Sequence, residues 1–440
     1  MTPKPTNNVL ISCDVVVLGG GPAGSTIAAL LAEKGWHVEV LEKDTHPRFH
    51  IGESLLPHSL PFLERLGVLG SVEKIGLKKY GAEVISSSYH KRLTFHFANA
   101  MNPSHPYAFQ VRRSEFDQIL LHNCRRKGAM VHEGLSASDV VFGQNGLARI
   151  QAVDAQRTRS IWEARYVVDA TGRGAFLAGR LGLKRRNPHH NSVAFFSHFA
   201  GVERSQGKDT GNISLIWFEY GWFWMIPFKD GITSVGAVCW PSYLKTRTGD
   251  IDQFFEATVA LCPPVAERLK NAKLTMPVMV AGNYSYQATQ MVGEAYILIG
   301  DAYAFVDPVF SSGVHLAMNS AMLGAEVVDA YLKGAPEFKT VKLRFERTVQ
   351  KGLKTFSWFI YRFTQPAFQY LLLFPRNIFR VEEAILSIFA GDVFREHSYG
   401  LRLFLFKTLY YLVALFTFRK NFHAYRFKKR GMGEHVPDNH

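Results

Sequence analysis

The chain has 440 residues, of which 47% are hydrophobic and 20% charged, proportions typical of a globular protein with a large core and not of a disordered one. Its four cysteines are scattered without a CxxC pair or a His/Cys cluster, so we expect no metal site and a reducing compartment. The formal net charge is +14, and residues 341–440 contribute 17 Lys and Arg against 7 Asp and Glu.

The basic C-terminal stretch is also aromatic, since residues 341–440 hold 22 of the 58 Phe, Tyr and Trp. Such a composition suits nucleic acid or an anionic membrane surface. No nucleic-acid-binding motif accompanies it, so we expect no nucleic-acid partner and favour a membrane surface or a substrate-lining role. The first residues show no basic stretch followed by an apolar one. We therefore expect a cytoplasmic protein without a signal peptide, at the inner face of the membrane if the C-terminal region contacts lipid.

The first predicted unit is a strand, a glycine-rich turn, a helix and a second strand. Its parts are a strand over 14–18, the glycines Gly19, Gly21 and Gly24, a helix over 25–34, and a strand over 37–42 that ends on Glu42. Glycines in this pattern permit a tight turn, close approach of the backbone to a pyrophosphate, and close packing of helix on strand. The helix N-terminus offers N–H groups, and an acid about 20 residues further on accepts from a ribose hydroxyl. The spacing predicts a bound dinucleotide, with an ordinary glycine-rich βα turn as the alternative.

Two later apolar runs are predicted to be strands: residues 161–172, ending in a turn, and residues 295–301, ending on Asp301. Between them, over roughly 190–275, alternating apolar runs predict an antiparallel sheet. Helical patterns dominate from residue 314 onward. The predicted fold class is therefore α/β, with a Rossmann-like domain, an inserted antiparallel β substrate domain and a C-terminal helical region.

The expected domains follow from these changes of pattern. They are 10–190 for the first part of the dinucleotide domain, within which 80–110 contributes to the substrate domain, 191–275 for the β-rich substrate domain, 276–330 for the second part of the dinucleotide domain, and 331–440 for the helical, basic and aromatic region.

Two segments far apart in the chain carry the most specific information. GWFWMIPF (221–228) is interpreted as a rigid aromatic turn, with a buried strand end terminated by proline as the alternative. GDAYAFVDPVFSSG (300–313) ends in a Ser-Ser-Gly turn before a predicted helix. Backbone N–H groups in such a turn bind an anion without a charged side chain. A cofactor pyrophosphate or ring on the same amides is the alternative occupant.

Together these residues resemble the flavin-dependent halogenases, within the p-hydroxybenzoate-hydroxylase-like superfamily of FAD-dependent oxidoreductases, over about residues 10–330. The motifs that carry the resemblance are GGGPAG (19–24), PRFHIGESLLP (47–57), KYGA (79–82), VRRSEFD (111–117), DATG (169–172), GDA (300–302), WxWxIP at Trp222, Trp224, Ile226 and Pro227, and FxxPxxSxG at Phe305, Pro308, Ser311 and Gly313. Lys79 two residues before Gly81 is the form of halogenases of the non-tryptophan type.

The resemblance implies that residues 10–190 and 276–330 bind FAD. The implied cofactor-binding residues are Gly19, Gly21, Ala23, Gly24, Glu42, Lys43, Arg48, Ser54, Arg113, Asp301, Pro308 and Gly313. It also implies a halide site at Ser311, Ser312 and Gly313, and a barrier between flavin and substrate at Trp222, Trp224, Ile226 and Pro227.

The implied activity uses reduced FAD, O2 and chloride or bromide to form hypohalous acid, which halogenates an electron-rich ring. Lys79 is the implied catalytic residue, either hydrogen-bonding the oxidant or forming a haloamine, and a desolvated lysine suits both roles. Spacing alone does not exclude Lys78. The expected substrate is phenol- or pyrrole-like, carrier-protein-tethered or lipophilic, and the expected partner is a separate flavin reductase. The alternatives are an aromatic monooxygenase or polyprenyl reductase, and a non-catalytic flavin-binding protein at a membrane surface.

Residues 403–418 are mostly apolar but include Lys407, and this run is short for a hydrocarbon core of roughly 30 Å. A basic cluster follows it. Three interpretations remain open: a monotopic membrane anchor, an aromatic lining for the channel of a long substrate, or a helical lid with a solvated basic edge. His315, one turn into the helix after the serine–glycine turn, is expected to pack and not to catalyse.

Overall fold

The computed structural model describes residues 10–144, 146–394 and 400–417. β1 (Leu10–Leu18) lies inside a mostly parallel sheet because its inner residues, Val15 to Val17, are wholly buried on both faces. The sheet order is β7 (Met130–Glu133), β2 (Val38–Glu42), β1, β10 (Arg159–Asp169), β9 (Ala148–Val153) and β8 (Ser136–Phe142), with β17 (Tyr296–Leu298) paired to β10. The predicted Rossmann-like unit is confirmed.

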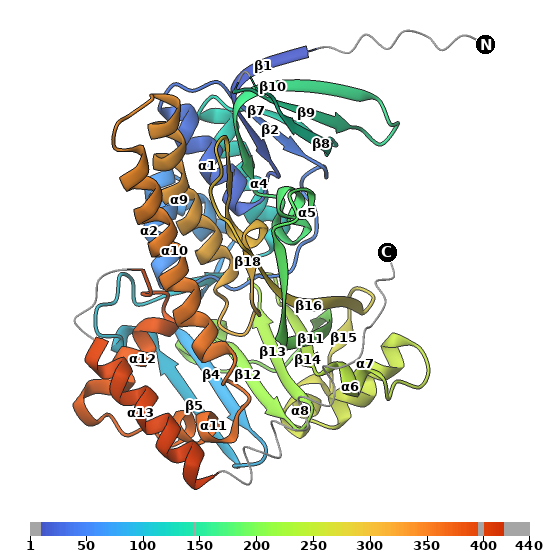
Figure 1. The fold of residues 1–440 in the computed structure, drawn as a ribbon. Coiled ribbons are helices and arrows are strands. Elements are labelled where there is room, and N and C mark those ends of the chain that lie inside the picture. Colours follow the sequence, from blue (N-terminus) through green and yellow to red (C-terminus); the bar gives the residue numbers. More distant parts are fainter. Residues whose placement is uncertain (1–9, 145, 395–399, 418–440) are drawn as a thin grey trace.

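Helices cover this sheet and bring the chain back between its strands (Figure 1). They include α1 (Pro22–Glu33), which packs against α4 (Arg113–Arg126) and α9 (Gly313–Leu332), and the short helices α2 (Leu60–Leu66), α3 (Leu69–Ile75) and α5 (Phe176–Arg180). Glycine is needed at one position in the turn before α1 and at one position in its first turn. Gly19 has φ +98°, and a Cβ on Gly24 would overlap the Gly19 carbonyl oxygen.

A second, larger sheet lies below the first in Figure 1. Its order is β18 (Ala304–Phe305), β16 (Met279–Ala288), β11 (Lys184–Ala200), β14 (Ile232–Cys239), β13 (Gly221–Pro227), β12 (Ile213–Phe218), β4 (Gly81–Ser86) and β5 (Lys91–His96), with β15 (Lys273–Leu274) paired to β11. Most pairs are antiparallel, as expected, but β12 and β4 run parallel. A small separate ladder joins β3 (Leu77–Lys79) to β6 (Ala108–Gln110).

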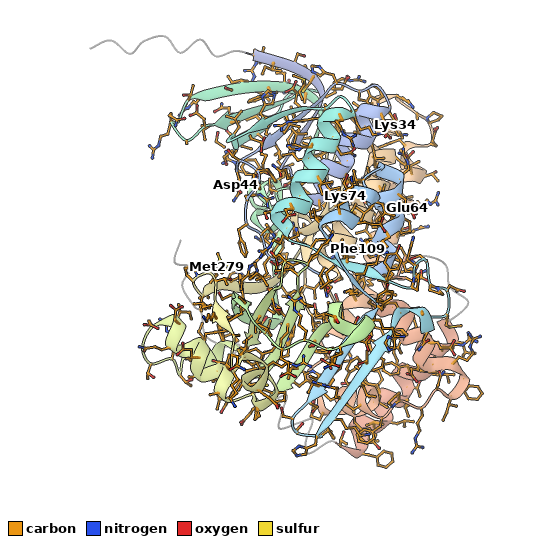
Figure 2. All side chains as sticks on the ribbon, turned by 180° about the vertical axis from the view of Figure 1, so that it is seen from behind. Lys34, Asp44, Glu64, Lys74, Phe109 and Met279 are labelled. Atoms are coloured by element: carbon orange, nitrogen blue, oxygen red, sulfur yellow. The ribbon has the colours of Figure 1, made fainter. Side chains whose placement is uncertain are left out.

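This sheet differs from the sequence-based expectation at two places. Helices α6 (Pro241–Leu244), α7 (Ile251–Ala260) and α8 (Pro263–Leu269) interrupt the expected β region, and the Asp250 carboxylate caps α7 by accepting from the Gln253 N–H. The sheet also continues past residue 275, because β16 pairs with β11. Met279, at the start of β16, is labelled at this edge in Figure 2, which shows the packed side chains from behind.

The C-terminal helices are α10 (Phe338–Ile360), α11 (Pro366–Leu373), α12 (Val381–Phe389) and α13 (Gly400–Phe416). In Figure 1 the last three lie beside β4 and β5. Their apolar side chains form one buried cluster with the face of the second sheet that carries Trp222, Trp224 and Ile226. The predicted helical region is confirmed, and it packs as an integral layer on the second sheet. The opposite face of that sheet packs against α6 to α8.

Replacement of Gly236 by alanine is expected to destabilise the second sheet. Gly236 lies between Trp224 and Phe196 on the neighbouring strands, and a Cβ there would overlap the Trp224 ring. Moving that ring should lower the free energy of unfolding by about 1–3 kcal/mol. Chemical denaturation measures this loss. Gly70→Ala, in α3 where a Cβ meets nothing within 4 Å, is the matched control and should leave stability unchanged or slightly raised. Equal stability of both variants would contradict the packing argument.

Candidate functional site

A cavity of about 630 Å³ lies where the two sheets meet, at the end of β1 that carries the glycine turn. Eleven of the twelve residues expected to bind FAD line it. They are Gly19, Gly21, Ala23, Glu42, Lys43, Arg48, Ser54, Arg113, Asp301, Pro308 and Gly313. Gly24 does not line the cavity, since it packs against Gly19 and holds α1 close to the strand. The volume lies within the range of pockets for small molecules and cofactors.

The residues around the glycine turn fit a dinucleotide. A Cβ on Gly21 would meet only an Arg48 nitrogen, at 3.7 Å, so the backbone there is open to close approach by a pyrophosphate. The Glu42 carboxylate accepts from the N–H groups of Gly20 and Asp44, at 2.6 and 2.9 Å. A carboxylate has about four lone-pair sites, so Glu42 retains capacity for a ribose hydroxyl.

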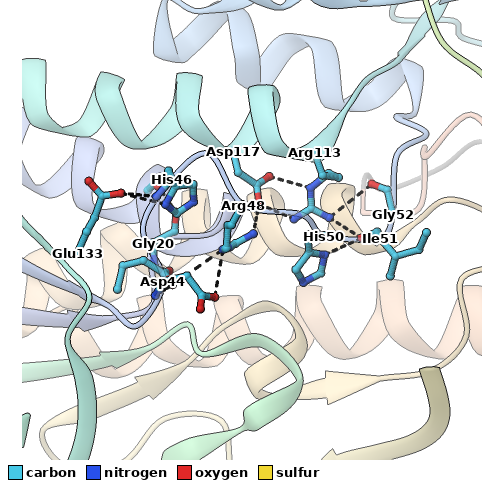
Figure 3. A network of polar contacts seen from close by, with 12 residues as sticks. Gly20, Asp44, His46, Arg48, His50, Ile51, Gly52, Arg113, Asp117 and Glu133 are labelled. Carbon is cyan, nitrogen blue, oxygen red and sulfur yellow. Dashed lines mark hydrogen bonds and ion pairs between the residues drawn. The ribbon is translucent and has the colours of Figure 1, made fainter. Parts of the chain in front are cut away.

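Two arginines at the rim of this cavity are held by one buried carboxylate, Asp117 (Figure 3). Arg113 donates to both Asp117 oxygens at 2.7 and 2.9 Å and to the Ile51 carbonyl at 2.9 Å, while Arg48 donates to Asp117 at 3.1 Å. Burial acts to raise the pKa of Asp117, but the adjacent Arg113 and Arg48 hold that pKa below its usual range. Arg113 thus positions the segment that carries Ile51, and its contact with the cofactor stays a prediction.

Asp301 belongs to the short 3-10 helix η5 (Gly300–Ala302), which follows β17, and lines the same cavity. Desolvation raises the pKa of its carboxyl to about 6, against the opposing charges of Arg173 and Arg113. A carboxyl in this state can accept from hydroxyl groups, which agrees with the expected contact of Asp301 with the cofactor.

Lys79, the last residue of β3, is 1% exposed, and its Nζ donates to the Ser54 Oγ at 2.7 Å. Burial lowers the pKa of its ammonium to about 7. Lys78 differs, because its side chain is at the surface beside Glu73 and over the Tyr107 ring. The structure therefore separates the two lysines that spacing left open, and Lys79 is the desolvated one.

The backbone after Lys79 is fixed by a residue that the sequence analysis did not single out. The Asn212 side-chain oxygen accepts from the N–H groups of Tyr80 and Gly81, at 2.9 and 2.8 Å. A Cβ on Gly81 would overlap the Phe95 carbonyl, which explains the glycine of the KxG pattern. Because Asn212 is more than a hundred residues away in the chain, no local pattern could have revealed it.

Lys79 lines a second, much smaller cavity of about 40 Å³, between the second sheet and the C-terminal helices. Ile213, Val309 and Ser311 border both cavities. Ser54 lines the large cavity and Lys79 lines the small one, so their hydrogen bond connects the walls of the two cavities. About 40 Å³ holds water but no aromatic ring, and Phe363, Leu372 and Phe389 are among the side chains that close it.

The segment of the expected barrier motif adopts the alternative structure, a buried strand that ends at proline, and its role as a barrier stays a prediction. Residues 221–227 form strand β13 and not a turn, with Pro227 as its last residue. Trp222, Trp224 and Ile226 share one face of that strand and line the large cavity, but they do not reach the small one. Successive side chains of a strand point to opposite faces, so these alternate residues share the face toward the large cavity. Among the described residues, those that border both cavities are Ile213, Val309 and Ser311, so these three form the partition.

The serine–glycine turn is built as a helix N-terminus. Gly313 is the first residue of α9, and a Cβ there would meet nothing within 4 Å. Ser311 adopts φ +56°, which is strained for a residue with a Cβ, and its N–H donates to the Pro308 carbonyl at 2.9 Å. The first N–H groups of a helix have no partner within it. The geometry is suited to an anion, and the halide assignment to Ser311, Ser312 and Gly313 remains a prediction.

A buried polar network supports this turn, and the sequence analysis missed it. Asp307 Oδ2 lies 2.9 Å from His190 Nε2 and accepts from the Ser192 Oγ at 3.2 Å, while Asp307 Oδ1 accepts from the Val309 N–H at 3.2 Å. His190 and Ser192 lie on β11, over a hundred residues earlier in the chain. The network ties the second sheet to residues 307–309, directly before the serine–glycine turn.

His315 packs, as expected. Its Nε2 lies 2.8 Å from the Gly391 carbonyl and its Nδ1 lies 3.2 Å from the Ser59 Oγ. Burial, with the nearby His58, lowers the pKa of the imidazole to about 3, so it is neutral. It fastens the end of α12 to α9.

Comparison with known proteins now decides the family. The tryptophan halogenase family model matches residues 14–74 and 76–366. The chain belongs to this family. It is an FAD-dependent halogenase that uses halide as co-substrate, which sets aside the monooxygenase, polyprenyl reductase and scaffold alternatives.

Similar proteins include several named halogenases. The 1H-pyrrole-2-carbonyl-[peptidyl-carrier protein] chlorinase of Pseudomonas fluorescens is 32% identical over 408 residues, covering 87% of this halogenase and 89% of the relative. The tryptophan 2-halogenase of Chondromyces crocatus is 32% identical, covering 77% and 65%. The myxobacterial chondrochloren halogenase CndH superposes with a TM-score of 0.77 at 31% identity, covering 87% and 91%. A Cytophaga hutchinsonii flavoprotein/dehydrogenase superposes with a TM-score of 0.85 at 28% identity, covering 92% and 99%.

The buried amine should make the halogenase more stable as the pH rises. The unfolded Lys79 has a pKa near 10.5 and the folded one near 7, so between these values the unfolded state binds more protons. The free energy of unfolding should therefore increase with pH across this window. Lys79→Met, which fills the same space without a charge, should lose this contribution and be more stable than wild type near neutral pH. Denaturant unfolding at about pH 7 and about pH 10 tests the difference, and an identical pH response of both proteins would contradict it.

Asp307→Asn should impair the serine–glycine turn while the fold persists. Asparagine keeps one oxygen, so its amide nitrogen faces either His190 and Ser192 or the Val309 N–H, and a buried group loses its partner at a cost of about 1–3 kcal/mol. We expect the KM for bromide to rise roughly 10- to 100-fold with little change in FAD affinity. Ser192→Ala, which removes a single contact, is the control and should have a smaller effect. Unchanged bromide dependence in Asp307→Asn would show that the network does not position the turn.

Proposed function

We propose that this halogenase chlorinates or brominates an electron-rich aromatic ring, phenol- or pyrrole-like, that is tethered to a carrier protein or carried on a lipophilic chain. The observation that supports this proposal most directly is the hydrogen bond between Lys79 and Ser54 across the partition of two cavities. The relative that acts on a pyrrole bound to a carrier protein makes that substrate form the first to test.

The chemistry divides between the two cavities. Reduced FAD, when bound, supplies the activation of O2 that converts halide to hypohalous acid. The N–H groups of Ser312 and Gly313 at the start of α9 hold the halide, and the positive end of the helix dipole favours it there. Ile213, Val309 and Ser311 keep the ring away from the large cavity, so halide reacts first.

Lys79 then directs the oxidant at the ring. Its amine is an ionisable group in the wall of the small cavity. It lies beyond the partition, at hydrogen-bonding distance from Ser54. With a pKa near 7, the ammonium can donate to hypohalous acid, and the neutral amine can react with it. The same position near the partition suits both roles.

Two further parts of the proposal concern partners and location. The sequence holds no second dinucleotide-binding motif, which supports delivery of reduced FAD by a separate flavin reductase. A cytoplasmic location with peripheral contact at the inner face of the membrane, through the basic and aromatic C-terminal region, agrees with the composition of residues 341–440.

The decisive assay supplies the protein with FAD, a flavin reductase, NADH, O2 and bromide, together with a carrier-bound pyrrole, a free pyrrole or a phenol. We expect a brominated product, recognised in mass spectrometry by the bromine isotope doublet. Lys79→Met should reduce product at least about 100-fold while FAD binding and reductase-dependent O2 consumption persist. Lys78→Met, at the adjacent surface position, is the control and should retain activity. An oxygenated product without bromine, or full activity in Lys79→Met, would refute the proposal.

A further inference from the structure

The outward side of α13 is apolar where a surface helix is normally polar. Leu401, Phe404, Leu412 and Leu415 repeat along one face of the helix and are 69%, 63%, 49% and 68% exposed. Thr408 lies among them, and its hydroxyl donates to the Phe404 carbonyl of its own helix. The face therefore presents a continuous apolar stripe, which we call the outer face.

A loop tip extends this stripe. Ile378 and Phe379, in the short 3-10 helix η6 (Ile378–Arg380), are 60% and 74% exposed. Phe379 and Arg380 both have positive φ, which is unfavourable for residues that carry a Cβ. The Arg402 Nε of α13 donates to the Phe379 carbonyl at 3.0 Å, so the tip is joined to the first turn of the helix. A contiguous apolar surface of this kind marks an interaction site, in contrast to isolated exposed leucines.

The sequence of α13 and of the residues that follow it is basic. Residues 400–433 include no Asp or Glu, and their basic residues are Arg402, Lys407, Arg419, Lys420, Arg426, Lys428, Lys429 and Arg430. Those beyond 417 lie outside the described residues, but the sequence places them directly after α13. An apolar helix face followed in the sequence by a basic cluster is the pattern of a helix that lies in the plane of an anionic lipid surface.

The length of α13 argues for lying flat. At about 1.5 Å per residue the helix is about 25 Å long, less than the roughly 30 Å of a bilayer's hydrocarbon core. Within the described ranges, no helix is both long and apolar enough to cross a membrane. A second copy of the chain fits the face less well, because association would bring two basic segments together.

We propose that the outer face of α13 and the Ile378–Phe379 tip dock this protein, lying flat, on an anionic lipid bilayer. This identifies the surface and the lipid class behind the proposed membrane contact. α13 packs on α11 and α12, whose Leu372, Leu386 and Phe389 close the small cavity. Docking thus brings the closed side of that cavity to the lipid, and, in so far as the proposed halogenation holds, favours a ring borne on a lipid-soluble chain.

The test is co-sedimentation of the full chain with vesicles of phosphatidylcholine containing about one third phosphatidylglycerol, and with vesicles of phosphatidylcholine alone. We expect binding to the anionic vesicles, weakened by salt. Leu412→Glu should weaken vesicle binding at least about tenfold, because it places a charge on the face that contacts the lipid. Leu343→Glu on α10 replaces a leucine of almost equal exposure, 48% against 49%, and should bind as wild type. Thermal melting and FAD absorbance show that both variants are folded.

Several results would overturn docking. Docking is wrong if the wild type does not sediment with anionic vesicles, or if it sediments equally with uncharged ones. It is also wrong if Leu412→Glu and Leu343→Glu lose vesicle binding to the same extent, or if both keep it. Sedimentation velocity supplies another: a dimer that Leu412→Glu dissociates would make the face an interface between copies. Vesicle binding needs no turnover, and bromination of a water-soluble phenol needs no vesicle, so docking and halogenation fail independently.

Discussion

The hydrogen bond between the buried Lys79 amine and the Ser54 hydroxyl is the constraint around which the site is arranged. Asn212 fixes the backbone after Lys79, and Ser54 forms a bridge to Gln110 beside β3. Burial without a carboxylate partner is what brings the pKa of the amine near 7, since no nearby charge compensates its desolvation. A salt bridge at this position would hold the lysine charged and tie it to its partner.

This constraint also gives the C-terminal helices a part in the site. Side chains that follow α10 or belong to α11 and α12, including Phe363, Leu372 and Phe389, close the cavity in which Lys79 lies. The same helices form one apolar cluster with the tryptophan face of β13. A ring can enter only when some of these side chains move, so selection of the substrate depends on the packing of the helical layer as well as on the lysine.

The motifs could be recognised in the sequence because each consists of residues close together in the chain. The glycine turn, α1 and β2 follow from a few adjacent residues, and the helix after Ser312 follows from the turn and the apolar pattern beyond it. Eleven of the twelve expected cofactor residues line one cavity, because those motifs all lie at the junction of the two sheets. The predicted turn at GWFWMIPF was wrong. Proline and bulky rings suggested a turn there, but the segment is a strand. Its pairing with β12 and β14 outweighed the proline, which sits at the strand's end.

The sequence alone determined the family, the dinucleotide turn and the choice of a lysine near residue 79, because these depend on short-range spacing. Only the tertiary structure distinguished Lys79 from Lys78, assigned the partition to Ile213, Val309 and Ser311, and revealed the support of the serine–glycine turn by Asp307. The physical reason is that desolvation, cavity walls and buried polar networks arise where segments far apart in the chain are packed together. Spacing along the chain carries no record of such contacts.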